Sequence, residues 1–176
     1  MWRIRSESAG DERAVDALVE MGFGAGRFAK TAYRLREGVA PVTDLSFVGV
    51  NDAGELLGSV RFWPVMIGGH KSLLLGPLAV RPDLRGQGIG IALMQHGLNA
   101  ARSAGHESVV LVGDEPYYAK VGFAKVKPGQ IRFPGPVDPE RVLGLSLKPG
   151  ALIGLSGEVR RAQINQPVSA QAAPLG

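Results

Sequence analysis

The chain contains no cysteine, which excludes disulfide bonds and catalysis by a thiolate. Its three histidines are isolated, and no H-x-x-x-H pair or carboxylate cluster accompanies them, so the sequence predicts no metal site. No apolar run approaches the roughly 18 residues that a membrane-spanning helix needs, and the N-terminus lacks the apolar core of a signal peptide. We therefore expect a cytoplasmic protein with no membrane association.

Blocks of like charge are also missing from the sequence. Lys and Arg outnumber Asp and Glu by 20 to 16, which gives a formal net charge of +4, but no basic run is longer than two residues. Such a charge favours phosphate-bearing ligands in general, whereas the scatter of the basic residues disfavours a nucleic-acid groove. The length of 176 residues and the 45% hydrophobic content indicate one globular domain.

The most informative stretch is Leu73–Gly90, in which an apolar run leads into a glycine-rich turn and then a helical pattern. The pattern predicts a buried strand over Lys71–Val80 and a helix over Ile89–Ala104. Glycines let a backbone approach an anion closely, and the first turn of a helix offers unpaired N–H groups and a positive dipole end. We therefore interpret Arg85–Gly90 as a cradle for a pyrophosphate.

The spacing of these glycines excludes two common phosphate loops. A dinucleotide-binding loop needs G-x-G-x-x-G, whereas the glycines here follow G-x-G-x-G. A nucleoside-triphosphatase loop ends in G-K-[ST], and Gly88-Ile89-Gly90 has neither a lysine nor a hydroxyl. What remains is R-x-x-G-x-G, with a glycine-rich turn that binds nothing as the alternative.

A second apolar run, Val109–Val112, predicts a short buried strand parallel to the first. A strand–helix–strand crossover is right-handed, so both strands end at the same edge of the sheet, where α/β proteins bind ligands. This topology brings Gly113–Tyr118 beside the glycine-rich turn and nominates Tyr117 and Tyr118 as site residues. Gly76-Pro77 predicts a bulge that parts the central strand from its neighbour.

Two sequence patterns together resemble those of the GNAT superfamily of N-acetyltransferases. They are L-A-V-x-P-x-x-R-G-Q-G-I-G over Leu78–Gly90 and Y-x-x-x-G-F over Tyr118–Phe123, and the resemblance extends from about Trp2 to Phe123. It implies an α/β fold with a V-shaped mixed sheet flanked by helices. It also implies acetyl-CoA as co-substrate, with no metal, and direct transfer of the acetyl group to an amine.

The resemblance also implies roles for particular residues. Backbone groups of Leu78, Ala79 and Val80 would hold the pantetheine arm and polarise the thioester carbonyl. Tyr118 would protonate the leaving thiolate, which is chemically sound for a phenol that is neutral at pH 7. A packing role for Tyr118 is the alternative. The pyrophosphate would be bound by Arg85, Gly86, Gln87, Gly88, Ile89 and Gly90.

The acceptor, a small-molecule or peptide amine, is not identified by any motif. Many family members carry an asparagine after the second parallel strand, where this chain has Gly113-Asp114-Glu115-Pro116. We expect the acceptor site to be lined by Gly22–Arg36, the Met66–Gly69 turn and the segment Lys127–Gly150. The candidate general bases, besides a chain of water molecules, are Glu20, Asp114, Glu115 and His70.

Two other functions remain open at this point: a non-catalytic acyl-CoA-binding module and, from net charge alone, a nucleic-acid-associated protein. The resemblance favours a homodimer. We expect a single domain over residues 1–161 and a flexible tail over residues 162–176. The remaining predicted elements are strands at Trp2–Ser6, Leu45–Val50, Leu56–Val65, Ala124–Val126 and Leu152–Arg160, helices at Asp11–Met21 (ended by Gly22), Arg27–Arg36 and Pro116–Val121, a turn at Met66–His70, and a largely irregular segment at Lys127–Gly150.

Overall fold

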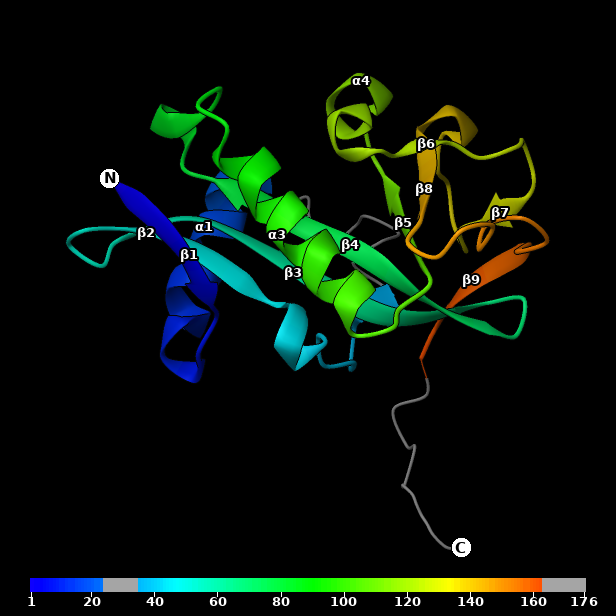
Figure 1. Ribbon diagram of the computed structural model, residues 1–176, viewed down its shortest axis with the longest axis horizontal. Helices are drawn as coiled ribbons and strands as arrows, with labels where there is room; N and C mark the ends of the chain where they lie inside the picture. Colours follow the sequence, from blue (N-terminus) through cyan, green and yellow to red (C-terminus); the bar gives the residue numbers. More distant parts are fainter. Residues whose placement is uncertain (24–34, 163–176) are drawn as a thin grey trace, which may run out of the picture.

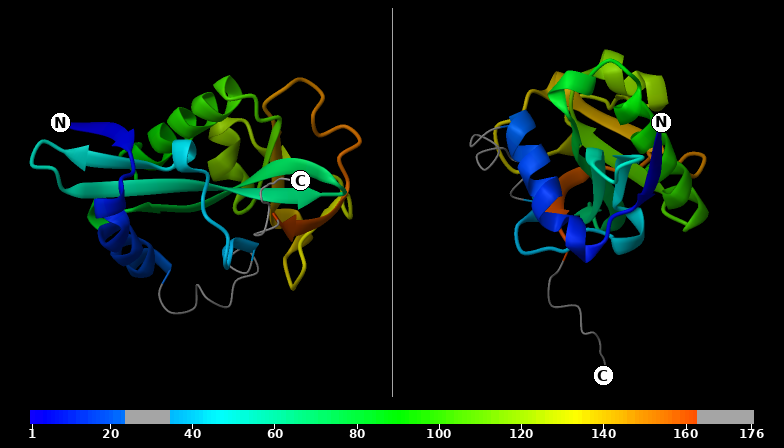
Figure 2. Two further views of the ribbon diagram at one scale, coloured as in Figure 1. Left: turned by 90° about the horizontal axis from the view of Figure 1, so that it is seen from below. Right: turned by 90° about the vertical axis from the view of Figure 1, so that its left-hand side faces the viewer.

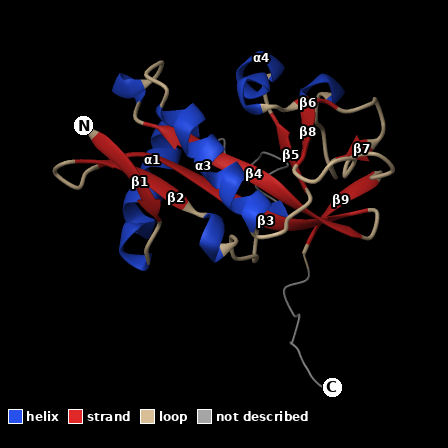
Figure 3. Ribbon diagram, viewed as in Figure 1, coloured by secondary structure: helices blue, strands red, loops and turns tan. Residues whose placement is uncertain are grey.

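The computed structural model describes residues 1–23 and 35–162, whose strands form one mixed sheet (Figures 1 and 3). Along the sheet the order is β1-β2-β3-β4-β5-β8-β6, while β9 pairs with β3 and with β7. Only β4–β5 and β7–β9 are parallel pairs among these strands. The strands are β1 (Trp2–Ser6), β2 (Phe47–Asn51), β3 (Leu56–Ile67), β4 (His70–Val80), β5 (Ser108–Val112), β6 (Ala124–Lys125), β7 (Ile131–Arg132), β8 (Val142–Ser146) and β9 (Gly157–Arg161).

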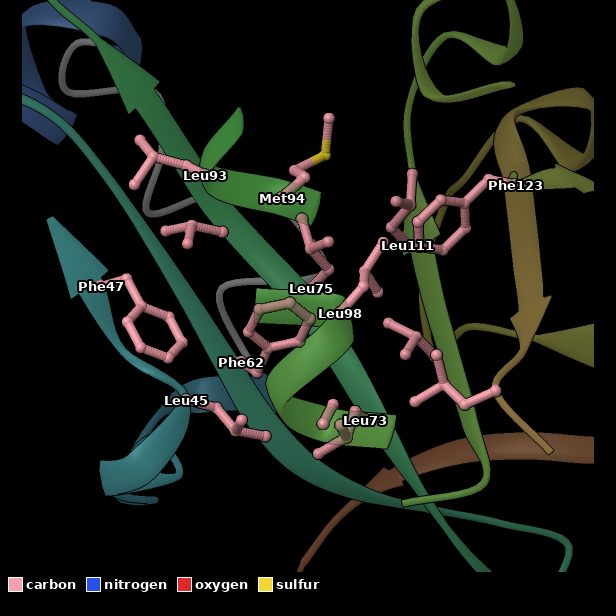
Figure 4. Close-up of a cluster of buried hydrophobic side chains, with 14 of the residues drawn as sticks. Leu45, Phe47, Phe62, Leu73, Leu75, Leu93, Met94, Leu98, Leu111 and Phe123 are labelled. Atoms are coloured by element: carbon pink, nitrogen blue, oxygen red, sulfur yellow. The ribbon is translucent and has the colours of Figure 1, made fainter. Parts of the chain in front are cut away.

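Helices cover both faces of this sheet, with α3 (Ile89–Ser103) on one face and α1 (Glu12–Phe23) on the other (Figure 2, left). The apolar face of α3 buries Leu93 and Leu98 against side chains from the sheet, such as Phe62, and these form the largest core cluster (Figure 4). Each fully buried side chain of this size contributes about 1.5–3 kcal/mol to folding. This packing fixes the start of α3 relative to the end of β4.

Strands β2 and β3, both predicted from the sequence, form a hairpin whose turn is organised by Asn51. The Asn51 side-chain oxygen accepts hydrogen bonds from the backbone N–H groups of Ala53 at 3.0 Å and Glu55 at 2.9 Å. Gly54 has a φ of +83°, which a residue with a Cβ rarely adopts. The β3–β4 turn is tighter than predicted, because both strands continue until only Gly68-Gly69 lies between them.

Strands β4 and β5 separate after a short stretch of pairing, which gives the sheet its V shape (Figure 1). They pair only at Leu73 with Val109 and Leu74 with Val110. The chain then passes through Gly76-Pro77, where the peptide bond is cis and the Gly76 carbonyl accepts a hydrogen bond from the Trp63 indole. The predicted parting of the central strand from its neighbour is thus confirmed, and it begins a few residues earlier than expected.

Several boundaries were predicted wrongly. Helix α1 continues through Gly22 to Phe23, and the last strand starts at Gly157 instead of Leu152. The segment Lys127–Gly150 is irregular over most of its length, as predicted, but it also contains two strands that the sequence did not predict, β7 and β8, and β8 pairs with β5 along its whole length. Its prolines all lie outside β8, so they do not interrupt that strand.

Two predictions, the flexible tail and the helix at Arg27–Arg36, lie almost entirely outside the described residues. Of that helix only Leu35 and Arg36 are described, and both are helical. The other predicted strands and helices are found within a few residues of their expected bounds. Within the described part of the chain, no helix is both long and apolar enough to span a membrane.

Candidate active site

Two cavities of about 250 and 450 Å³ meet where β4 and β5 part. The smaller, which we call the first cavity, is lined by the Leu75–Leu78 part of β4 and by residues that follow β5. The larger, the second cavity, lies between the end of β4 and the start of α3. Leu78, Tyr117 and Tyr118 line both cavities, so ligands in the two would meet at these three residues.

The second cavity contains almost all of the residues that the sequence nominates for coenzyme binding. Its β4 side consists of Leu78, Ala79 and Val80. Gln87 is the exception, because it is exposed and does not line the cavity. The remaining nominated residues that line it are Arg85, Gly86, Gly88, Ile89 and Gly90.

The glycines keep the turn before α3 open. Gly86 and Gly88 have φ angles of +84° and +85°, and no atom lies within 4 Å of the position that a Cβ would take at either residue. Gly88 is also the N-cap of α3, and its carbonyl accepts the first helical hydrogen bond, from Ala92. The backbone N–H groups that come before Ala92 in the first turn of α3 have no acceptor within the helix.

The charge of the second cavity also suits a pyrophosphate. Arg85 and Lys120 both line it, and the described lining residues include no Asp or Glu. The Lys120 ammonium lies 5.6 Å from the centre of the Tyr117 ring. Sequence reasoning missed Lys120 because Ala119–Val121 is a single 3-10 turn with no periodic pattern, and its position two residues after Tyr118 was the only available signal.

Tyr118 ends α4 (Glu115–Tyr118), a one-turn helix that follows β5. Its ring packs edge-on against Tyr117 and Phe123, with centroid distances of 5.1 and 6.2 Å, and lies so close to Gly113 that a Cβ there would clash with it. Burial raises the pKa of Tyr118 to about 12, with a further contribution from Asp114. The phenol is therefore neutral at physiological pH.

Tyr117 joins α4 to the start of α3. Its hydroxyl lies so close to Gly90 that a Cβ there would clash with it. Burial raises the pKa of Tyr117 as well. A glycine at position 90 is thus explained by this contact with Tyr117.

The first cavity has mixed chemistry, with apolar walls and three charged side chains, Arg36, Asp114 and Arg141. Asp114 follows β5 and Arg141 precedes β8, and their side chains lie 3.4 Å apart. The sequence includes Arg141 only within the long segment Lys127–Gly150 expected at the acceptor site and does not single it out, because only the pairing of β8 with β5 brings it to the end of β5. The Gly113 N–H donates to the Arg141 carbonyl at 2.9 Å.

Of the four candidate bases, Asp114 alone lines the first cavity. Glu115 borders a neighbouring shallow cavity, and His70 lies at the β3–β4 turn in another. Glu20 lies on α1 and does not line either of the two main cavities. The Met66–Gly69 turn, expected to line the acceptor site, does not do so either, because this end of β3 pairs with β9.

The described residues hold no group of three or more His, Cys, Asp or Glu side chains that could bind a metal ion. The arrangement therefore consists of two adjoining cavities, one built for an anion at a helix start and one with a carboxylate, with a buried phenol between them.

Comparisons with known proteins identify the family to which this chain is similar. The family model of the acetyltransferase (GNAT) domain matches residues 43–125. The uncharacterized N-acetyltransferase YhbS of Escherichia coli strain K12 is 35% identical over 122 residues, which cover 68% of this chain and 72% of that protein.

Solved structures give the same result along nearly the whole chain. The crystal structure of E. coli YhbS in complex with CoA is 30% identical with a TM-score of 0.78, and the match covers 93% of this chain and 91% of that one. A GNAT family acetyltransferase from Brucella melitensis, in complex with acetyl-CoA, is 28% identical with a TM-score of 0.70, covering 94% and 99%.

Proposed function

Since the chain belongs to the GNAT superfamily and is an acetyl-CoA-dependent N-acetyltransferase, we propose that acetyl-CoA binds in the second cavity and the acceptor amine in the first. The observation that carries this assignment is that Leu78, Tyr117 and Tyr118 line both cavities. A thioester at this junction would face an amine from one side and the Tyr118 phenol from the other.

The coenzyme site follows from backbone geometry and charge. Beyond Leu74, β4 no longer pairs with β5, and an amide-bearing chain such as pantetheine pairs with Leu78–Val80 in the manner of an added strand. The pyrophosphate lies on the turn Arg85–Gly90, where open glycines, the α3 dipole and Arg85 all favour an anion. The complexes of the two relatives with CoA and acetyl-CoA support a coenzyme of this type as the ligand.

In the reaction that we propose, acetyl-CoA supplies the thioester and this chain supplies the polar groups. A backbone N–H at Leu78–Val80 donates to the carbonyl oxygen as negative charge develops there. Asp114, the carboxylate of the first cavity, accepts a proton from the acceptor ammonium directly or through water. The amine forms the new C–N bond, the C–S bond breaks, and Tyr118 donates its proton to the leaving sulfur. The nitrogen then releases its surplus proton to water, and water returns a proton to the Tyr118 phenolate, which restores the phenol.

The high pKa of Tyr118 is compatible with this role. The burial that raises the pKa of the phenol also disfavours a thiolate in the same place and raises the pKa of the leaving thiol. Proton donation to sulfur therefore avoids a free thiolate in a poorly solvated cleft, and the phenolate that it leaves regains a proton from water.

Steady-state release of the free thiol from acetyl-CoA, with and without a panel of amines, tests this proposal. We expect release that depends on the amine, with the acetyl group found on nitrogen by mass spectrometry. Tight calorimetric binding of acetyl-CoA without transfer to any amine would instead favour an acyl-CoA-binding module.

We also propose that residues 1–161 form one domain, which the continuous sheet from β1 to β9 supports, with residues 162–176 as a tail. Limited proteolysis should remove the tail and leave that domain intact.

A cytoplasmic location is supported by the use of acetyl-CoA, a cytoplasmic metabolite in bacteria. The expected homodimer is tested by analytical ultracentrifugation.

A further inference from the structure

The first cavity is small and mostly apolar in its walls. Its volume of about 250 Å³ matches one small molecule, and its walls include Val19 from α1, Leu75 from β4 and Leu111 from β5. The polar groups lie at the end where β5 and β8 meet and beside Gly76. A ligand of this cavity therefore has an apolar part and a charged part.

The charges of the cavity are the informative feature. Among the described lining residues, Arg36 and Arg141 contribute guanidinium groups and Asp114 a carboxylate, so charges of both signs face the cavity. The Arg36 guanidinium lies 5.8 Å from the Trp63 ring centre and beside Gly76, at the β4 side of the cavity. A bare ammonium ion, such as that of an alkylamine, is not favoured by such surroundings.

The Arg141 guanidinium has N–H donors available for a ligand. Its side chain is about half exposed, and its one ion pair within the described residues is the 3.4 Å contact with Asp114, which is too long for a good hydrogen bond. A guanidinium carries five N–H donors in a planar fork that matches a carboxylate. The neighbouring Asp114 places a negative charge close to this fork.

An amine that also carries an anionic group matches this pattern. Its ammonium would lie beside Asp114 and its anionic group beside Arg141, and the short separation of the two side chains suits charges on neighbouring atoms, as in an α-amino acid. Resting on the proposed placement of the acceptor in the first cavity, we infer that the acceptor is a small amine of the amino-acid type, and that Arg141 recognises its anionic group.

Matched pairs of acceptors test this inference: phenylalanine against phenethylamine, and leucine against isoamylamine, with kcat/KM corrected for the unprotonated fraction of each amine. We expect the carboxylate-bearing member of each pair to be preferred at least tenfold, the effect of one charge-assisted hydrogen bond. The phosphonate analogue of leucine distinguishes a carboxylate-specific site from a general anion site.

Substitutions test whether Arg141 is the residue responsible for the preference for carboxylate-bearing amines. Arg141→Gln should reduce the preference to less than about threefold, whereas Asp114→Asn should lower kcat/KM for both members of a pair alike. The control is Arg160→Gln on β9, a side chain that is 75% exposed and lines neither cavity, and it should keep the full preference.

A ratio near one in the unmodified protein, a faster plain amine, no acetylation of any carboxylate-bearing amine, or an unchanged ratio in Arg141→Gln would overturn the inference. Calorimetric binding of acetyl-CoA is measured in parallel and separates the two proposals. If acetyl-CoA binds and plain amines are acetylated equally well, the proposed function stands and the inference about the acceptor fails.

Discussion

Replacing Tyr118 by phenylalanine removes the proposed acid and little else. The ring keeps its packing against Tyr117 and Phe123, and within residues 1–23 and 35–162 the phenol oxygen has no hydrogen-bond partner to lose. The melting temperature should therefore stay within about one degree of that of the unmodified protein. Any loss of rate then reflects chemistry and not folding.

The size of that loss follows from the chemistry of proton transfer. General acid catalysis contributes about 10²–10⁴-fold, and a phenol with a pKa of about 12 is a weak acid, so we expect the lower end. We predict a fall in kcat of about 100-fold, close to 2.7 kcal/mol, with KM for acetyl-CoA changed less than about threefold.

The pH dependence of the unmodified protein provides a second measurement of the same role. A phenol of ordinary pKa would be about one-tenth ionised at pH 9, whereas a pKa of about 12 leaves about one part in a thousand ionised. The rate of the unmodified protein should therefore show no loss from phenol ionisation up to pH 9.5 or so. Ionisation of Tyr118 lies above that range because its pKa is raised.

Thiol release under single-turnover conditions is the appropriate assay, because it excludes slow product release as the step that limits the rate. Tyr117→Phe is the neighbouring comparison, and we expect its main effect on KM for acetyl-CoA, since its hydroxyl lies at Gly90. A Tyr118→Phe rate within threefold of the unmodified protein would refute the acid role and leave Tyr118 as a packing residue.

Three further predictions concern the cradle and the fold. Gly88→Ala should raise KM for acetyl-CoA at least tenfold, because its Cβ enters the open turn before α3. The matched control is Gly54→Ala, since Gly54 has a similar φ and equally open surroundings in the β2–β3 turn. Equal changes of KM in the two variants would contradict the role of the Arg85–Gly90 turn as a pyrophosphate cradle. Asp11→Asn should lower the free energy of unfolding by about 1–3 kcal/mol at pH 7, because the carboxylate accepts two hydrogen bonds from an arginine of β1 and one from a backbone N–H. These bonds hold the pKa of Asp11 well below its usual value, so its contribution to the free energy of unfolding is complete above about pH 4 and is lost as the pH falls further. Urea titrations of the unmodified protein and the variant should therefore show a smaller difference in the free energy of unfolding at pH 3 than at pH 7. The same difference at both pH values would argue against this account. Gly97→Ala should destabilise the protein by about 1–3 kcal/mol in thermal melts, because its Cβ would collide with the buried Phe62 ring, and an unchanged melting temperature would show that the ring has room to move.

Local patterns were sufficient to predict the unit that carries the coenzyme site. The apolar run of β4, the open glycines before α3 and the periodic face of α3 are encoded within about 30 consecutive residues, and each is a preference of the backbone itself. The position of Tyr118 also followed from sequence, because the handedness of a β–α–β crossover leaves one edge for the ends of β4 and β5.

The acceptor side of the site was decided by tertiary structure. Strand β8 has an apolar stretch, but its partner β5 lies about 30 residues away, and the prolines around it made the segment resemble a loop. That pairing alone brings Arg141 to Asp114, and the packing of α4 against the start of α3 places Tyr117 against Gly90. A strand gains its hydrogen bonds from a neighbour and not from its own residues, so such contacts exist only once the whole sheet has formed.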